Sequence, residues 1–249
     1  MRVLITGVSR GLGLGLANAH LDRGDQVLAL GRTLAPTLQA RDGLRFESLD
    51  LLDPSAYGPA VAALTRGCPS IDLVWLNAGV LGSVGDLRET PVADMERVMS
   101  VNVWANKILL DQLFEPGRPT IDEVIGISSG AAVNGNRGWG GYAISKAALN
   151  MLIQLESKEH EATRFYALAP GLVDTAMQEQ LCGMEPDERF PSLDRLRAAR
   201  GTVAMPDPDE AARRILDALP ALRQLPSGSF ADLRQLATKK AARLDPEGK

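Results

Sequence analysis

The sequence has 249 residues, enough for one large domain with a core of its own. Its formal net charge of −4 excludes nucleic acid as the main partner, because binding to a phosphate backbone requires a basic surface. No stretch approaches the roughly 18 apolar residues of a membrane span, and the first residues lead into a strand without a signal peptide. We therefore expect a cytoplasmic protein with neither nucleic acid nor membrane as a partner.

The few cysteines and histidines do not indicate a metal site. Cys68 and Cys182 are far apart in the sequence and match no metal-ligand spacing. Cys182 is expected to be a small buried apolar residue, since no activating neighbour is evident. His20 and His160 are expected on helix surfaces without a catalytic part. The sequence therefore predicts no metal.

Short apolar runs alternate along the chain with longer segments of helical periodicity. The expected strands are Val3–Thr6, Gln26–Gly31, Leu44–Ser48, Leu73–Asn77, Val124–Ser128 and Phe165–Ala169. The expected helices are Leu12–Asp22, Pro54–Thr65, Pro91–Phe114 and Tyr142–His160. This alternation predicts a single α/β domain over residues 1–249, with a parallel sheet covered by helices on both faces. The stretch 176–205 breaks the pattern and predicts an insertion over the sheet edge, while the polar stretch 239–249 is expected to fray.

A glycine-rich turn, TGVSRGLG, follows the first expected strand and precedes the first helix. Gly7 permits a sharp exit from the strand, and Gly11 and Gly13 leave room for a phosphate to approach the backbone. The helix N-terminus would offer unpaired N–H groups and a partial positive charge to a pyrophosphate. The turn thus favours dinucleotide binding, although an ordinary structural turn remains the alternative.

The end of the second strand indicates which dinucleotide is preferred. An acidic residue there would bind the ribose 2′-hydroxyl of NAD, but the sequence Gly31-Arg32-Thr33 has no carboxylate. Arg32 can hold a 2′-phosphate with its planar fork, Arg10 can supply a second cation and Thr33 a hydroxyl. We predict NADP(H) as the preferred cofactor, with NAD(H) possible. The alternative is that Arg32 stacks on the adenine or faces solvent.

Further motifs follow in an order that resembles the short-chain dehydrogenase/reductase superfamily, in its single-domain branch of roughly 250 residues. The match runs from Met1 to about Thr175. One departure is Leu76, where the family usually has an asparagine, and this change should alter packing more than catalysis. The motifs are the glycine turn, Leu49-Asp50-Leu51, Asn77-Ala78-Gly79, Asn102, Ser129, Tyr142 with Lys146 in a Y-x-x-x-K pair, and the turn that runs from Pro170-Gly171 to Thr175.

This resemblance implies a Rossmann-type doubly wound fold and assigns roles to individual residues. Tyr142 would be the general acid/base, Lys146 would hold the nicotinamide ribose, Ser129 the substrate carbonyl, and Asn102 would anchor the lysine through water; Ser128 is the runner-up to Ser129. The residues implied in cofactor binding are Gly7, Ser9, Arg10, Gly11, Leu12, Gly13, Arg32, Thr33, Asp50, Leu51, Asn77, Ala78, Gly79, Tyr142, Lys146, Pro170, Gly171, Val173 and Thr175. The tail loosely resembles carbonyl-reductase-like relatives, in which Ser229–Asp232 would form the final strand.

The spacing of the Tyr–Lys pair suits proton transfer. Tyr142 and Lys146 are four residues apart and so share one face of a helix. A free tyrosine titrates near pH 10, and we expect the nearby ammonium to lower the pKa of Tyr142 toward neutrality. The chain is thus predicted to be an NADP-dependent oxidoreductase that interconverts an alcohol and its carbonyl compound.

Substrate and assembly are less closely specified by the sequence. Relatives place a substrate lid at 176–205, whose apolar residues would suit an apolar or aromatic carbonyl compound. The arginines of this stretch would select a carboxylate or simply be solvated. Relatives also pair the helices Pro91–Phe114 and Tyr142–His160 across a two-fold axis, which implies a homodimer or homotetramer. The alternative function is a non-catalytic NAD(P)-binding protein that senses redox state or mediates signalling.

Overall fold

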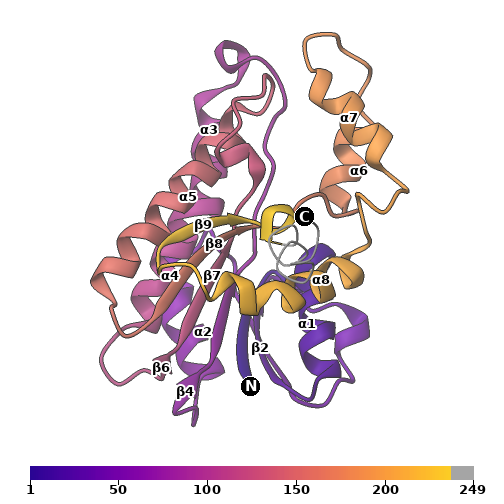
Figure 1. Ribbon diagram of the computed structural model, residues 1–249. Helices are drawn as coiled ribbons and strands as arrows, with labels where there is room; N and C mark the ends of the chain where they lie inside the picture. Colours follow the sequence, from indigo (N-terminus) through magenta and orange to yellow (C-terminus); the bar gives the residue numbers. More distant parts are fainter. Residues whose placement is uncertain (237–249) are drawn as a thin grey trace, which may run out of the picture.

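A seven-stranded parallel sheet forms the centre of the molecule (Figure 1), in a computed structural model that describes residues 1–236. The strand order is β3-β2-β1-β5-β7-β8-β9, so the chain crosses over at β1 and winds in both directions from there. The strands are β1 (Arg2–Thr6), β2 (Gln26–Gly31), β3 (Leu44–Ser48), β5 (Leu73–Leu76), β7 (Glu123–Ile127), β8 (Arg164–Ala169) and β9 (Ser229–Asp232). This is the Rossmann-type doubly wound sheet that the sequence predicts.

The expected strands agree with the structure to within about a residue at each end, and the predicted final strand is present as β9, parallel to β8. Two short strands, β4 (Ser70–Ile71) and β6 (Thr120–Ile121), were not expected. They pair in parallel as a separate small sheet just before β5 and β7. Two-residue strands carry too little periodicity to be read from a sequence.

Helices cover both faces of the sheet (Figure 1). Helices α1 (Gly11–Asp22) and α8 (Pro208–Leu222) pack on the face that presents Val3 and Ile5, while α2 (Tyr57–Leu64), α4 (Ala105–Leu113) and α5 (Gly140–Glu159) pack on the face that presents Leu4. Successive residues of β1 therefore point into different cores, as the period of two in a strand requires. Because both faces are covered, the strand reads as a continuous apolar run.

The predicted helix Pro91–Phe114 is divided. The chain forms α3 (Val92–Met99), a π-helical turn η4 (Ser100–Trp104) and then α4. Apolar periodicity indicates a helix but cannot reveal a single turn with i→i+5 bonds, which is common at functional sites. Helix α8 was not anticipated, although Asp207 caps its N-terminus by accepting from the amide of Glu210. The D-x-x-E spacing of a capping signal was therefore present in the sequence.

The 176–205 segment contains two helices, α6 (Ala176–Cys182) and α7 (Pro191–Ala199), which project beyond the sheet (Figure 1). Its inner side carries a third apolar cluster, separate from the two cores that cover the sheet. Cys182 lies partly buried beside this cluster. The predicted frayed stretch 239–249 lies outside the described residues. In the described part of the chain, no helix combines the length and apolar character needed to cross a membrane.

The expectation that His20 lies on a helix surface is wrong. The residue is 1 % exposed, and Trp75 donates its indole N–H to His20 Nε2 at 3.0 Å. The other ring nitrogen lies 2.8 Å from Asp25 Oδ2, so His20 links α1 to the centre of the sheet. Burial lowers the pKa of His20, which keeps the ring neutral between these two partners. A contact across 55 residues leaves no signal in the local sequence.

Candidate active site

The glycine turn at the carboxyl end of β1 has the geometry of a phosphate cradle. Gly7 and Gly11 adopt positive φ angles of 78° and 58°, a region that favours glycine. A Cβ atom on Gly13 would lie 2.2 Å from the carbonyl oxygen of Gly7, so only glycine fits there. Arg10 occupies the N-cap of α1 without a side-chain cap, and the first turn of the helix has no acidic residue. The positive end of α1 is thus open to an anion, and the chain fits a bound dinucleotide.

Asn77 and Thr6 hold this turn in place. The Asn77 side-chain amide donates to the carbonyl oxygens of Thr6 at 2.9 Å and Gly7 at 3.3 Å. Thr6 Oγ1 in turn accepts the backbone N–H groups of Asn77 and Ala78, each at 3.0 Å. The N-A-G turn after β5 therefore supports the glycine turn after β1.

The turn after β8 approaches the same place. The methyl group of Thr175 is 3.3 Å from the position that a Cβ on Gly11 would take. Gly171 has a positive φ of 81°, and Val173 is 7 % exposed. Segments 164 positions apart in sequence thus border one site at the carboxyl edge of the sheet, which is where open α/β sheets bind ligands.

The residues predicted to hold a 2′-phosphate follow β2, apart from Arg10 at the N-cap of α1. Arg10, Arg32 and Thr33 are exposed, and neither arginine has an ion pair within the described residues. The end of β2 meets the glycine turn, since a Cβ on Gly31 would be 3.8 Å from Gly7 Cα. Of the other predicted cofactor-binding residues, Ser9 and Asp50 are exposed, Leu12 is buried and Leu51 is partly buried.

Tyr142 and Lys146 lie on the first turns of α5. The Lys146 ammonium is 5.7 Å from the centre of the Tyr142 ring and donates to the main-chain carbonyl oxygen of Ile127, at the end of β7, at 2.7 Å. Lys146 is 4 % exposed, and burial lowers its pKa to about 8. A lysine in this position can exchange a proton near neutral pH.

The expected lowering of the pKa of Tyr142 is not found. Burial raises the pKa of this phenol, and a hydrogen bond with Ser129 only partly opposes the change. The ammonium of Lys146 is turned toward the carbonyl of Ile127 and lies over the tyrosine ring. The phenol is therefore held protonated in this structure, in the form that donates a proton.

Ser129 and Ser128 point to different partners. Ser129 Oγ caps the short helix η5 (Gly130–Ala132) by accepting from the amide of Ala131 at 3.1 Å, and it bonds to Tyr142. Ser128 is buried and donates to Asn150 Oδ1 at 2.5 Å. Only the first of the two thus adjoins the tyrosine.

Asn102 lies in the middle of the π-helical turn and is fully buried. Its side chain exchanges two hydrogen bonds with the backbone of Val80, at 2.8 and 2.9 Å, and donates to Ser145 Oγ at 2.9 Å. Ser145 donates to the carbonyl of Tyr142 at 2.7 Å. A Cβ on Gly79 would lie 3.2 Å from Asn102 Oδ1 and 3.5 Å from Lys146 Nζ, so the two side chains meet behind the N-A-G turn.

The apolar cluster of the 176–205 segment adjoins Tyr142. The rings of Tyr142 and Trp139 are 6.4 Å apart, centre to centre. Apolar side chains thus pack against the partly buried ring of Tyr142. Residues that build the cluster or pack against it are Leu81, Val84, Trp139, Tyr142, Leu172, Met177, Leu181, Cys182, Met184, Phe190, Leu193, Leu196, Ala199 and Met205.

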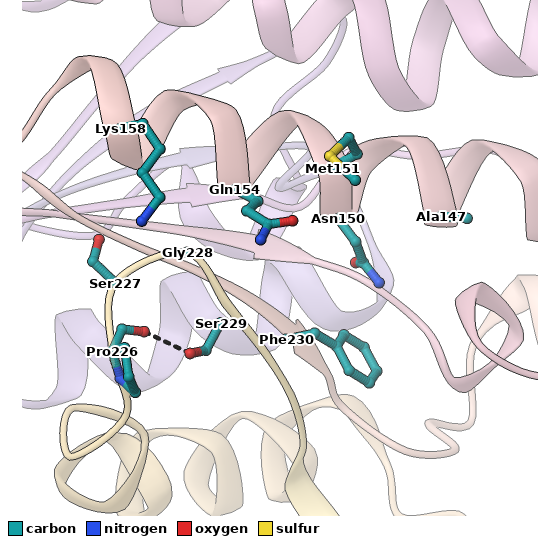
Figure 2. Close-up of a pocket in the computed structure, with 10 residues that line it drawn as sticks. All are labelled: Ala147, Asn150, Met151, Gln154, Lys158, Pro226, Ser227, Gly228, Ser229 and Phe230. Carbon is teal, nitrogen blue, oxygen red and sulfur yellow. Dashed lines mark hydrogen bonds between the residues drawn. The ribbon is translucent and has the colours of Figure 1, made fainter.

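Two surface hollows occur among the described residues, and the second shares Leu172 with the apolar cluster. One of about 450 Å³ lies between α5 and the loop leading into β9, and Figure 2 shows Asn150, Gln154 and Lys158 of α5 pointing into it. The other, about 480 Å³, is lined by Pro170, Gly171, Leu172, α8 and the residues after β9. Neither is lined by Ser129, Tyr142 or Lys146. No cluster of metal-ligating side chains occurs among the described residues.

Known proteins with similar sequences belong to a family of dehydrogenases. The model of the family described as short chain dehydrogenase matches residues 1–185. A benzil reductase ((S)-benzoin forming) of Bacillus subtilis is 29 % identical over 231 residues, which cover 87 % of this chain and 92 % of the relative. An uncharacterised oxidoreductase of Saccharomyces cerevisiae is 32 % identical over 182 residues, covering 71 % and 72 %.

Solved structures show the same likeness over nearly the whole chain. The KRED1-Pglu enzyme superposes with a TM-score of 0.79 at 26 % identity, covering 92 % of this chain and 99 % of its own. A short chain dehydrogenase/reductase from Saccharomyces cerevisiae has a TM-score of 0.78 at 26 % identity, covering 95 % and 98 %.

Proposed function

Since this chain belongs to the short chain dehydrogenase family of NAD(P)-binding oxidoreductases, we propose that it interconverts an alcohol and its carbonyl compound with NADP(H). Tyr142 is the proposed general acid/base. The observation that carries the proposal is the grouping of Ser129, Tyr142 and Lys146, with Lys146 and Asn102 meeting behind the N-A-G turn that supports the glycine turn.

The proposed mechanism assigns one task to each side chain. A bound nicotinamide dinucleotide supplies or accepts the hydride. Ser129 orients the substrate oxygen, and the protonated phenol of Tyr142 donates a proton to that oxygen as a carbonyl is reduced. Lys146, with a pKa of about 8, adjoins the phenol as a source of positive charge and of a proton. Asn102 and Ser145 hold the first turn of α5 in place through the carbonyl of Tyr142.

The apolar residues around Tyr142 influence the proton transfer through the local dielectric. Apolar side chains that pack against the partly buried Tyr142 lower the local dielectric, and electrostatic interactions are stronger where the dielectric is low. The raised pKa keeps the phenol of Tyr142 protonated at neutral pH, which is the form that reduction of a carbonyl consumes, and it also makes the phenol a weaker acid.

The preference for NADP(H) rests on the end of β2. Arg32 and Arg10 are exposed cations beside the glycine turn, and the strand end offers no carboxylate to repel a 2′-phosphate. Arg32→Ala should weaken NADPH binding by roughly tenfold or more, about 1.4 kcal/mol, while changing NADH binding little. Equal losses for both cofactors, or none for NADPH, would contradict the assignment.

The substrate is proposed to be an apolar or aromatic ketone or aldehyde, with the 176–205 segment as its lid. The cluster beside Tyr142 is apolar, with Trp139 as an aromatic wall. The similarity to two bacterial proteins named benzil reductase makes benzil a suitable first member of a test panel. Aliphatic carboxylate-bearing ketones in the same panel test the alternative that the arginines of the segment select an anion.

Tyr142→Phe tests the catalytic assignment. The variant keeps the ring and loses only the hydroxyl, so it should bind NADPH as the wild type does and lose at least about a hundredfold in kcat, the lower range for acid–base catalysis. Full turnover by a folded variant would contradict the role of Tyr142. Cofactor binding without turnover of any carbonyl by the wild type would favour the alternative, a non-catalytic redox-sensing or signalling protein.

We further propose that the chain assembles as a homodimer or homotetramer through α4 and α5. Ile144, Met151 and Leu155 lie along one face of α5, and they are 44 %, 54 % and 53 % exposed. Trp104, the N-cap residue of α4, is 53 % exposed. A surface helix with such a stripe is expected to be covered. Leu155→Glu should lower the mass measured by light scattering to that of a monomer, and an unchanged mass would exclude this face.

A further inference from the structure

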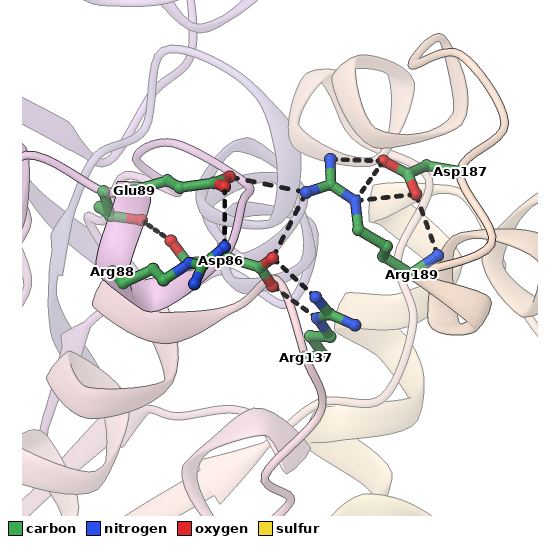
Figure 3. Close-up of polar contacts among 7 residues, drawn as sticks. Asp86, Arg88, Glu89, Arg137, Asp187 and Arg189 are labelled. Carbon is green, nitrogen blue, oxygen red and sulfur yellow. Dashed lines mark hydrogen bonds and ion pairs between the residues drawn. The ribbon is translucent and has the colours of Figure 1, made fainter.

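Three charged residues connect the 176–205 segment to the body of the protein at its outer rim (Figure 3). Asp86, in the loop after the N-A-G turn, accepts two hydrogen bonds from Arg137, at 2.5 and 2.7 Å. The same carboxylate accepts a bond of 3.3 Å from Arg189, which belongs to the 176–205 segment. Asp86 therefore lies between two arginines from different parts of the chain, with its side chain only 13 % exposed.

Arg189 has further partners that hold its guanidinium in place. Arg189 forms a bidentate pair with Asp187 of the same segment, at 2.8 to 3.1 Å, and lies 3.5 Å from Glu89. Its guanidinium also lies 5.0 Å from the centre of the Phe190 ring. The guanidinium of Arg189 is therefore already oriented when it pairs with Asp86, so less side-chain entropy is lost when this ion pair forms.

The carboxylate of Asp86 is not used in the way its position suggests. Asp86 is the N-cap residue of the short helix η3 (Leu87–Glu89), where an aspartate usually accepts a backbone N–H of the helix it begins. Here no such cap bond forms, and the side chain is turned to Arg137 and Arg189 instead. The two arginines hold the pKa of Asp86 below its usual value.

Arg137 connects this cluster to the catalytic helix. It lies five residues before Tyr142, in the loop that leads into α5. The amide of Gly85 donates to the carbonyl of Gly138 at 3.1 Å, so the two loops are joined by backbone as well as by side chains. On the same loop, Trp139 donates to Ser192 of the 176–205 segment at 2.8 Å.

We infer that Asp86 is a positioning residue for the proposed reaction, on which this inference rests. By pairing with Arg189 and Arg137 together, it holds the 176–205 segment against the loop that leads into α5, and so keeps the apolar cluster over Tyr142. Without this contact the segment would open more often and admit water to the phenol. The pairs are partly exposed, so the contact depends on ionic strength.

Amide hydrogen exchange of the full chain without ligand tests the inference independently of any enzymatic activity. Arg189→Gln removes one positive charge of the 176–205 segment, with its pairs to Asp86, Asp187 and Glu89, and leaves the Asp86–Arg137 pair intact. At low salt it should accelerate exchange within 176–205 about two- to fivefold, the range of a partly exposed ion pair. The difference should vanish near 1 M salt, where charges more than about 3 Å apart are screened.

Arg195→Gln is the matched control. Arg195 lies on α7 in the same segment, is exposed and has no ion pair among the described residues. The control should exchange as the wild type does. In the background of Asp86→Asn, Arg189→Gln should have a smaller effect than in the wild type, because the contact is already lost. Equal effects in the two backgrounds, an effect that persists in high salt, or an equal effect of Arg195→Gln would overturn the inference.

A kinetic measurement connects the contact to the reaction. Asp86→Asn should raise KM for the carbonyl substrate more than it lowers kcat, and added salt should bring the wild type toward the variant. A loss of kcat alone, independent of salt, would count against a positioning role. If no substrate is turned over at all, the proposed function fails, while the exchange experiment still decides whether the contact holds the segment.

Discussion

The buried ammonium of Lys146 lowers the free energy of unfolding, and replacing Lys146 allows this effect to be measured. Burial lowers the pKa of its ammonium from the ordinary 10.5 to about 8, a gap equivalent to about 3.4 kcal/mol. The folded state disfavours the charged form, so this penalty is fully present below pH 8. Between pH 8 and 10.5 the unfolded chain binds more protons, and stability therefore rises with pH.

Lys146→Met should accordingly stabilise the protein at pH 7. The substitution removes the penalty but also the 2.7 Å bond to Ile127, and a hydrogen bond from a charged group contributes about 1.5–3 kcal/mol. The remainder is a gain of about 0.4–1.9 kcal/mol, or about 1–8 °C in Tm for a chain of this size. The variant should lose turnover at the same time.

Thermal unfolding of the ligand-free protein at pH 7 and pH 10 measures the effect. The gain should shrink at pH 10, where the wild-type lysine no longer carries a charge. Lys158→Met, at an exposed position of the same helix, should change stability by less than about 0.5 kcal/mol at either pH. A destabilised Lys146→Met variant, or a gain that is equal at the two pH values, would refute the reasoning.

Two further changes probe the turn and the buried histidine. Gly13→Ala places a methyl group 2.2 Å from the carbonyl oxygen of Gly7, so it should lower the free energy of unfolding by about 1–3 kcal/mol and weaken NADPH binding. Gly135→Ala, whose methyl group would meet no atom within 4 Å, should change neither quantity. His20→Gln should destabilise the protein at pH 7 by about 1–2 kcal/mol, because Asp25 loses a partner. The pKa of His20 is lowered in the folded state, so the neutral ring stabilises the wild type above pH 6.5 and this effect is lost as the pH falls. The difference in unfolding free energy between wild type and variant should therefore narrow toward pH 5. A difference that stays constant would contradict the neutral ring.

Features encoded by local pattern could be predicted from the sequence. The central strands β1, β5 and β7 were found almost to the residue because each is a short apolar run that is buried on both faces. The glycine turn was recognisable because a positive φ at Gly7 and the close approach at Gly13 leave room for no other residue. The Y-x-x-x-K spacing likewise placed Tyr142 and Lys146 on one helical face.

Features that depend on distant contacts could not be predicted. The burial of His20 depends on Trp75, and the direction of the pKa shift of Tyr142 depends on apolar groups from the 176–205 segment. The ion pairs of Asp86 join loops that are 51 and 103 residues apart. A sequence shows such charges only as solvated surface residues, since nothing local indicates which of them meet.

The central claim is that the group around Tyr142 carries out NADPH-dependent reduction of a carbonyl. The most direct test mixes the purified protein with NADPH and a panel of ketones and aldehydes that begins with benzil, and follows oxidation of the cofactor. We expect turnover of at least one apolar carbonyl compound by the wild type and its loss in Tyr142→Phe, which still binds NADPH. Turnover that survives in Tyr142→Phe, or binding of NADPH without turnover of any compound, would contradict the account.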